Sequence, residues 1–266
     1  MFRVRTAITV LLALALSAAG SGQQEATEFE MSGDFQLVVS GEIDREASIF
    51  QSSGGVLVVS DRLPTPVLLV PGASVIQEVP LLRLVQRSGG RVGLLRGDEL
   101  KRLGSFSVGS DGVSFSHSGV SARLQPKEPL VGESSLGDLL EHSPGYRARA
   151  DAYAPDNAIL AKLNEVESGY TVRVVFGSWC HVCTNFLPRG IRVQEALSDS
   201  AIRFEYYGLP KSPWDPKHPE VARLSVESLP TAVVYQGTKE IGRYAGADQW
   251  QKPEARIWAA IQSTQR

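Results

Sequence analysis

The chain has 266 residues, which is enough for about two domains. Its 27 Lys and Arg residues nearly balance its 29 Asp and Glu residues, for a formal net charge of -2, and 42% of its residues are hydrophobic. This balance excludes the basic footprint of a nucleic-acid-binding protein and a polybasic membrane-binding patch. Nucleic acid is therefore not expected as a partner.

The first twenty residues have the three parts of a secretory signal peptide. Arg3 and Arg5 give a positive start, residues 7–16 are apolar, and small residues follow, with cleavage expected after Ala19 or Gly20. The apolar stretch is shorter than the roughly 20 residues that span a bilayer. We predict that residues 1–20 are removed and that the protein is exported to the periplasm or another extracytoplasmic compartment, without stable membrane insertion. An uncleaved N-terminal anchor is the alternative.

Residues 24–128 are predicted to form a small all-β domain. Short segments rich in Val, Leu and Ile alternate with turn-forming residues, which is typical of a sandwich or barrel. Strands are expected at 35–43, 56–60, 67–70, 81–86 and 91–95. Asp111-Gly112 between two alternating runs predicts a hairpin. The sequence of this domain shows no catalytic motif, and its role is left open.

Residues 129–150 are rich in breakers and are predicted to be a linker with a short helix at 136–141 that stops near Pro144-Gly145. From residue 151 to 266 the pattern changes to alternating helices and strands. Strands are expected at 170–176, 201–207, 231–235 and 240–244, and helices at 155–169, 180–197, 220–224 and 248–261. This order predicts an α/β domain with a central mixed sheet flanked by helices.

The chain has two cysteines, Cys180 and Cys183, three residues apart. A disulfide that closes so short a loop constrains the unfolded chain very little, so the pair is expected to be reactive or to be half of a metal site. Cys180 falls where a strand meets a helix, and the positive end of the helix dipole favours a thiolate there. Cys183 then lies close enough to attack a mixed disulfide formed at Cys180. His181, if cationic, helps to hold the thiolate.

The surroundings of this motif resemble the thioredoxin superfamily over about residues 150–266. Trp179 precedes the first cysteine, and Pro188 falls five residues after the second, where thioredoxins have a helix-kinking proline. Leu229-Pro230-Thr231 looks like the cis-proline signature of the family, and Gly246 follows at the customary distance.

The resemblance implies a thioredoxin-like C-terminal domain after the all-β domain. In the family, the loop that corresponds to Pro230 is cis, packs against the active-site sulfurs and offers backbone groups to an extended substrate peptide. Thr231 flanks that proline. Trp179 is expected to shield the reactive sulfur of Cys180.

Two features depart from the family pattern. Classical thioredoxins carry a buried acid in the strand before the motif, and the matching position here is Val174. Glu205, on the next strand, is the nearest substitute in the sequence, although a surface or edge position is the expected one for it. The dipeptide His181-Val182 is neither the Gly-Pro of classical reductants nor the Pro-His of strong oxidases, so it does not fix the redox direction.

The sequence favours an exported thiol–disulfide oxidoreductase, with the reductase direction preferred. Cys180 attacks and Cys183 resolves, and the supporting residues are Trp179, His181, Pro230 and Thr231. Protein thiols and disulfides are the expected substrates, together with a redox recycling partner that the sequence does not identify, and no cofactor or resident metal is required.

Two alternatives remain open at this point. The first is a copper or zinc binding or delivery module, which would use Cys180, Cys183 and His181 or His218 as ligands. The second is a non-catalytic binding protein that has kept the thioredoxin fold.

Overall fold

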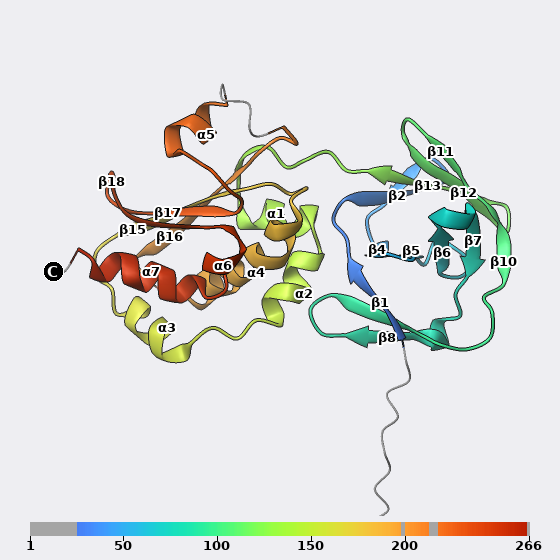
Figure 1. The fold of residues 1–266 in the computed structure, drawn as a ribbon, viewed down its shortest axis with the longest axis horizontal. Coiled ribbons are helices and arrows are strands. Elements are labelled where there is room, and N and C mark those ends of the chain that lie inside the picture. Colours follow the sequence, from blue (N-terminus) through green and yellow to red (C-terminus); the bar gives the residue numbers. More distant parts are fainter. Residues whose placement is uncertain (1–25, 198–199, 213–217, 265–266) are drawn as a thin grey trace, which may run out of the picture.

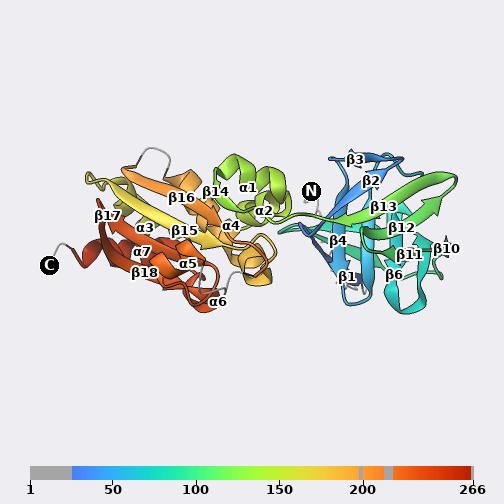
Figure 2. The same ribbon diagram turned by 90° about the horizontal axis from the view of Figure 1, so that it is seen from above.

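The computed structural model describes residues 26–197, 200–212 and 218–264. Figures 1 and 2 show two lobes side by side, a strand-rich lobe formed by the N-terminal half and an α/β lobe formed by the C-terminal half. The predicted signal peptide at 1–20 lies outside the described residues. Among the residues that are described, no helix has the length and hydropathy needed to cross a membrane.

The strand-rich lobe consists of two antiparallel sheets. The larger sheet has the order β10-β7-β6-β5-β4-β1-β9-β8, and the smaller has the order β11-β12-β13-β2-β3. The larger sheet contains β1 (Ala26–Met31), β4 (Ser48–Ser52), β5 (Gly55–Val59), β6 (Val67–Val70), β7 (Val75–Glu78), β8 (Leu84–Arg87), β9 (Arg91–Leu95) and β10 (Arg102–Ser105). The smaller sheet contains β2 (Phe35–Val39), β3 (Glu42–Asp44), β11 (Ser107–Gly109), β12 (Gly112–His117) and β13 (Val120–Pro126).

The central strands β5 and β6 of the larger sheet are covered on both faces, so their sequences are nearly continuously apolar. Leu57 and Val58 are neighbours on β5 and point to opposite faces, and neither is exposed. Val58 packs with Leu37 of the smaller sheet in one core, whereas Leu57 packs with Phe29 and Phe50 of its own sheet in a second core. The two sheets therefore enclose one core between them, and the larger sheet curls around the other.

Two predictions for this lobe have clear outcomes. The hairpin expected around Asp111-Gly112 is confirmed, although its turn residues are Ser110 and Asp111 and Gly112 already belongs to β12, where it pairs with Gly109 of β11. The strand expected at 81–86 is instead a one-turn 3-10 helix, Leu81–Arg83, followed by β8. Pro80 starts this turn, since its carbonyl accepts a hydrogen bond from the Arg83 N–H at 2.9 Å.

The α/β lobe has a central mixed sheet, as predicted. Its strand order is β14-β16-β15-β17-β18; β15 and β16 are parallel, and the other neighbours are antiparallel. The strands are β14 (Gly132–Ser134), β15 (Tyr170–Phe176), β16 (Ile202–Gly208), β17 (Thr231–Gln236) and β18 (Lys239–Ala245). The helices are α1 (Leu136–His142), α2 (Gly145–Asp151), α3 (Asn157–Asn164), α4 (His181–Ala196), α5 (Pro219–Leu224), α6 (Gly246–Gln249) and α7 (Pro253–Gln262).

Two helical regions differ from the sequence prediction. The helix expected at 136–141 forms as α1 and ends before Pro144, but α2 was not expected; it begins there because the Tyr146 N–H bonds the Ser143 carbonyl at 2.9 Å and so starts a new turn. Tyr146 and Ala150 are four residues apart and bury one face of α2. The C-terminal helix is divided into α6 and α7, since Pro253 begins the second helix at a position where a proline costs no hydrogen bond.

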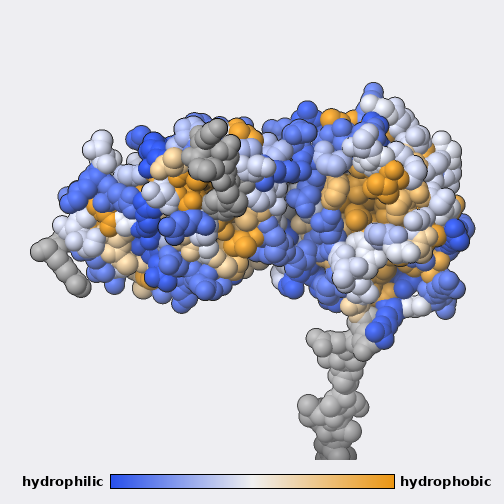
Figure 3. All heavy atoms as spheres, turned by 45° about the horizontal axis from the view of Figure 1, so that its top comes forward, coloured by the Kyte–Doolittle hydropathy of each residue, from blue (hydrophilic) through white to orange (hydrophobic). Residues whose placement is uncertain are grey.

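The two lobes meet where β1 and two tight turns contact α1 and α2. Glycines allow the close approach: a Cβ on Gly33 would lie 2.5 Å from the Ser143 Oγ, and one on Gly90 would lie 3.2 Å from the Ala148 Cβ. Arg149 of α2 donates a hydrogen bond to the carbonyl of Met31 in β1 at 3.0 Å. On the face shown in Figure 3, hydrophilic residues border this junction, while hydrophobic residues gather on the strand-rich lobe. Close backbone packing therefore holds the strand-rich lobe against α2.

Candidate active site

Cys180 and Cys183 lie at the C-terminal end of the central strand. β15 leads into the loop at 177–179, and α4 begins directly after Cys180. Two hydrogen bonds fix this loop: the Trp179 indole N–H donates to the Leu209 carbonyl at 3.0 Å, and the Ser178 hydroxyl accepts from the Leu130 N–H at 3.0 Å. The cysteines are therefore presented from a loop that is anchored on both sides.

Cys180 occupies the N-cap of α4, where the helix has unpaired N–H groups. Its sulfur accepts a hydrogen bond from the Cys183 N–H, with 3.4 Å between the two atoms. The pKa of Cys180 is lowered to about 6, chiefly because the Cys183 thiol donates a hydrogen bond to its sulfur. Burial opposes this shift, while the backbone N–H groups of Cys183 and Val182 and the charge on His181 add to it. Cys180 is therefore largely a thiolate at neutral pH.

Cys183 has the opposite environment. It is fully buried in the first turn of α4, and burial is the main cause that raises the pKa of its thiol well above the usual value. The negative charge on Cys180 raises the pKa further, and the Gly177 N–H, 3.5 Å from the Cys183 sulfur, only partly offsets it. Both cysteines are free. The pair thus combines an accessible thiolate with a buried, neutral thiol.

Alkylation measures this asymmetry directly. We expect the rate of Cys180 modification by iodoacetamide to reach half of its maximum near pH 6 and to be level above about pH 7.5, because only the thiolate reacts. Cys183→Ala removes the largest cause of the shift and moves the half-point upward. The measurement is mass spectrometry of peptides from protein alkylated across a pH series. A wild-type half-point near the ordinary thiol value, about 8.5, would contradict the assignment.

The predicted supporting residues fall into two groups. His181 is exposed at the start of α4 and contacts the Asn185 amide, with 3.1 Å between the nitrogens. Trp179 packs over Gly177, where a Cβ would lie 2.8 Å from the Trp179 ring. These two residues flank Cys180 in sequence and in space. That Trp179 shields the Cys180 sulfur stays a prediction.

Pro230 and Thr231 reach the site from β17. The peptide bond between Leu229 and Pro230 is cis, and the Pro230 carbonyl accepts a hydrogen bond from the Gly246 N–H at 3.0 Å. Thr231 is buried and pairs with Val175, the last residue but one of β15, which leads into the loop that carries the cysteines. Strand register therefore places both residues beside the end of β15.

The position expected to hold a buried acid is apolar. Val174 is 1% exposed and belongs to the same core cluster as Cys183. Glu205 lies next to Arg173, whose side chain points to the face of β15 opposite Val174, and its carboxylate is 3.1 Å from the Arg173 guanidinium. Glu205 therefore belongs to an ion-pair cluster on the other face of the sheet and does not substitute for the missing acid.

The strand-rich lobe contributes one wall of a cavity next to the cysteines. This cavity, of about 670 Å³, is lined by the turn between β1 and β2 and by residues of the motif, including Asp34, Trp179, His181 and Thr184. Burial raises the pKa of Asp34, and the positive charges of Lys211 and His181 act against this shift. Asp34 and His181 thus line the same cavity, one from each lobe.

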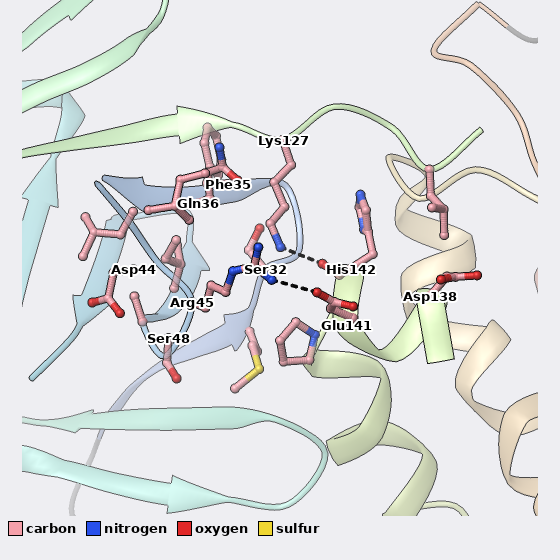
Figure 4. Close-up of a pocket in the computed structure, with 17 residues that line it drawn as sticks. Ser32, Phe35, Gln36, Asp44, Arg45, Ser48, Lys127, Asp138, Glu141 and His142 are labelled. Carbon is pink, nitrogen blue, oxygen red and sulfur yellow. Dashed lines mark hydrogen bonds and ion pairs between the residues drawn. The ribbon is translucent and has the colours of Figure 1, made fainter. Parts of the chain in front are cut away.

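A second cavity, of about 410 Å³, lies between the strand-rich lobe and α1 (Figure 4). The Arg45 guanidinium bonds the Glu141 carboxylate at 2.9 Å, and the Lys127 ammonium donates to the His142 carbonyl at 2.7 Å. Both interactions cross from one lobe to the other, as Figure 4 shows. The cysteines do not line this cavity, so it is separate from the cysteine pair and lies at the junction of the two lobes.

The residues named for a metal site do not form a cluster that could hold a metal ion. His218 lies just before α5, and its ring packs edge-on against Tyr207 with 6.1 Å between the ring centres. Within the described residues, no group of three or more His, Cys, Asp or Glu side chains is arranged to hold a metal ion.

Sequence analysis missed three residues that the fold brings to this site: Tyr146, Ser178 and Asp34. Ser178 and Asp34 carry no recognisable signal, because their roles arise from contacts with distant segments. Tyr146 does carry one, since the four-residue spacing of Tyr146 and Ala150 indicates a buried helix face. The breaker pair Pro144-Gly145 obscured that signal.

Comparison with known proteins assigns no family. No protein-family model matches the chain, and no curated protein matches it. Among solved structures, a protein of unknown function from Pseudomonas aeruginosa is 15% identical over 49% of this chain and 99% of its own, with a TM-score of 0.37. An HIV epitope scaffold is 15% identical over 50% of this chain and 93% of its own, with a TM-score of 0.39. Thioredoxin f2 from Chlamydomonas reinhardtii is 16% identical over 41% of this chain and 92% of its own, with a TM-score of 0.27. These scores are too low to assign a family, and the chemistry of the site rests on its own geometry.

Proposed function

We propose that the protein is an exported thiol–disulfide oxidoreductase whose α/β lobe is thioredoxin-like and whose nucleophile is Cys180. The observation that carries this proposal is the asymmetry of the pair: a Cys180 thiolate with a pKa of about 6 sits beside a buried neutral Cys183 thiol. Disulfide exchange needs both properties, because one sulfur must attack as an anion and the other must wait until the mixed disulfide has formed.

The reaction proceeds in two balanced steps. The Cys180 thiolate attacks one sulfur of a substrate disulfide, forms a mixed disulfide and releases the other substrate sulfur as a thiolate. Cys183 then loses its proton to solvent and attacks the Cys180 sulfur, and the second substrate sulfur leaves and takes up a proton. The substrate gains two electrons, and the protein is left with a Cys180–Cys183 disulfide. An external dithiol returns it to the reduced state.

The reductase direction is the better supported one. A lower thiolate pKa stabilises the reduced form and makes the pair more oxidising, as in oxidases whose cysteine has a pKa near 3.5, whereas thioredoxin has a pKa near 7. The value of about 6 for Cys180 lies closer to the reductant. The proposed substrates are disulfides of exported proteins, since the sequence of residues 1–20 has the form of a signal peptide.

The reduction potential of the pair tests this proposal. We expect the mature protein, equilibrated in glutathione buffers, to have a potential on the reducing side of about -200 mV. The oxidised fraction is measured by mass spectrometry after acid quenching and alkylation. A potential near -120 mV would mean that the protein oxidises thiols rather than reduces disulfides. A pair that never forms a disulfide would refute the oxidoreductase assignment.

A further inference from the structure

Tyr146 lies in the hydrophobic core of the α/β lobe, which also includes Cys183 and borders Cys180. Its side chain is 1% exposed, and among the described residues its hydroxyl has no hydrogen-bond partner. α2, which carries Tyr146, packs against α4, and Tyr146 and Cys183 belong to one core cluster. A buried hydroxyl without a partner costs about 1–3 kcal/mol, so a phenylalanine would give a more stable core unless the hydroxyl has another use.

The helix that carries Tyr146 meets the first turn of α4, since Arg149, three residues after Tyr146, lines one cavity together with His181 and Thr184. Burial is the main cause that raises the pKa of Tyr146 far above its usual value, and negative charge on Cys183 and then on Cys180 raises it further. Arg149 on the same helix acts in the opposite direction, and Asp34 from the strand-rich lobe adds to the increase. With so high a pKa the hydroxyl keeps its proton, so it is a hydrogen-bond donor and not a proton acceptor.

The reaction sequence explains why the donor is unpaired in the dithiol state. There the negative charge lies on Cys180, which already receives hydrogen bonds from the thiol and the N–H of Cys183. After Cys180 has entered a mixed disulfide, the charge has to form on Cys183 inside the core. The backbone donors to the Cys183 sulfur are the N–H of Gly177 and its own N–H, and Val174 offers none from its side chain. A donor from a side chain stabilises the charge further at this step.

We propose that the Tyr146 hydroxyl donates a hydrogen bond to the Cys183 thiolate during resolution of the mixed disulfide, and that Tyr146 is therefore a positioning residue for the second step only. This inference rests on the proposed oxidoreductase function. It also gives α2 a role in the chemistry, since this helix brings Tyr146 to the pair and at the same time contacts the strand-rich lobe through Arg149.

The test separates the two steps of exchange with Tyr146→Phe, which keeps the ring and removes only the hydroxyl. The full mature chain is reduced and mixed with dithiobisnitrobenzoate, an aromatic disulfide that releases a coloured thiolate once on attack by Cys180 and again on resolution by Cys183. Stopped-flow absorbance follows both phases. We expect the first phase to be unchanged and the second to slow about tenfold or more, as is typical of the loss of a hydrogen bond to a charged group.

Tyr244→Phe is the matched control. The Tyr244 hydroxyl is also buried without a partner among the described residues, but its ring packs on Trp250 and its pKa is raised by burial and by Tyr206 and Glu254, not by the cysteines. Both Phe variants are expected to melt at or above the wild-type temperature. Tyr146→Phe alone is expected to slow resolution and to raise the pKa of Cys183, measured by thiolate absorbance in a Cys180→Ser background.

Each other outcome overturns the inference. An unchanged second phase means that the hydroxyl does not assist Cys183, and an equal slowing in Tyr244→Phe means that the effect belongs to core packing. A lower melting temperature together with a slower first phase means that the Tyr146 hydroxyl supports the fold. If the wild type itself releases no second thiolate, the oxidoreductase function fails, which is a different result from normal exchange in both variants.

Discussion

Replacing Cys180 with Ser is expected to abolish disulfide exchange, with the rate falling on the order of 10³-fold or more, as when a nucleophile is removed. A serine hydroxyl at the N-cap of α4 can accept the same hydrogen bonds but does not ionise near pH 6, so the anion that starts the reaction is lost. The measurement is the reduction of a small disulfide and of a protein disulfide, with a dithiol as the source of electrons.

Cys183→Ser is the matched variant, and its expected result is qualitatively different. Cys180 still attacks, but no thiol is left to resolve the product, so mixed disulfides accumulate and are seen as a mass increase on acid-quenched, non-reduced protein. The helix N-terminus keeps a hydroxyl that can donate to Cys180. Full activity of the Cys180→Ser variant, or complete turnover of a protein disulfide by Cys183→Ser without added thiol, would show that the mechanism is wrong.

Arg173→Met is expected to have the largest effect on stability. The Arg173 side chain is 13% exposed and contacts three carboxylates, at 2.6 Å from Glu133, 3.1 Å from Glu205 and 2.6 Å from Glu220. Glu220 is itself only 10% exposed. Removing the guanidinium leaves that carboxylate buried beside one remaining cation, Arg223. We expect a loss of about 3 kcal/mol at neutral pH.

The pH dependence of this loss has a definite sign. Burial raises the pKa of Glu220, but hydrogen bonds from Arg223 and Arg173 outweigh it, and the folded-state pKa lies below the ordinary value. Ionised Glu220 therefore contributes stability above the unfolded-state pKa, and that contribution disappears as the pH falls through the folded-state pKa. The difference between wild type and Arg173→Met is expected to be largest near pH 7 and to shrink below about pH 4.

Tryptophan fluorescence during urea unfolding measures the loss of stability in Arg173→Met from the α/β lobe alone, because all four tryptophans of the chain follow residue 178. Arg192→Met is the control: its guanidinium is 45% exposed and 3.8 Å from Glu195, so a change below about 1 kcal/mol is expected. Equal unfolding midpoints for wild type and Arg173→Met at pH 7 would show that the carboxylate cluster does not need its central cation.

The sequence was most informative where a periodic pattern coincides with a local signal. The apolar run at 170–176 and the helix that opens at the motif have strong local preferences, and both form as β15 and α4. The predicted start of α3 was less accurate. Pro155 was expected in its first turn, but the Asp156 carboxylate caps the helix by accepting from the N–H groups of Ala158 and Ile159.

Other parts of the site depend on contacts that no local pattern encodes. β14 has the polar sequence Gly132-Glu133-Ser134 and is a strand because it pairs with β16. The contact between Gly33 and Ser143 joins residues that lie far apart in the chain, so their spacing carries no signal for it. The position of Tyr146 relative to Cys183 likewise follows from the packing of α2 on α4. Tertiary packing, and not local propensity, decides these features.

The hydrogen bond between Leu130 and Ser178 bears on how much of the chain the cysteine site requires. Before β14, the backbone at Leu130 lies so close to Gly208 that a Cβ there would be 2.1 Å from the Leu130 carbonyl oxygen. A fragment that began at residue 151 would lose this segment and leave the outer edge of β16 unpaired, as an open template for intermolecular strand pairing and aggregation. It would also lose α2, and with it Tyr146, which belongs to the same core cluster as Cys183. Any shortened form that keeps the cysteines in their native setting therefore has to begin before Leu130.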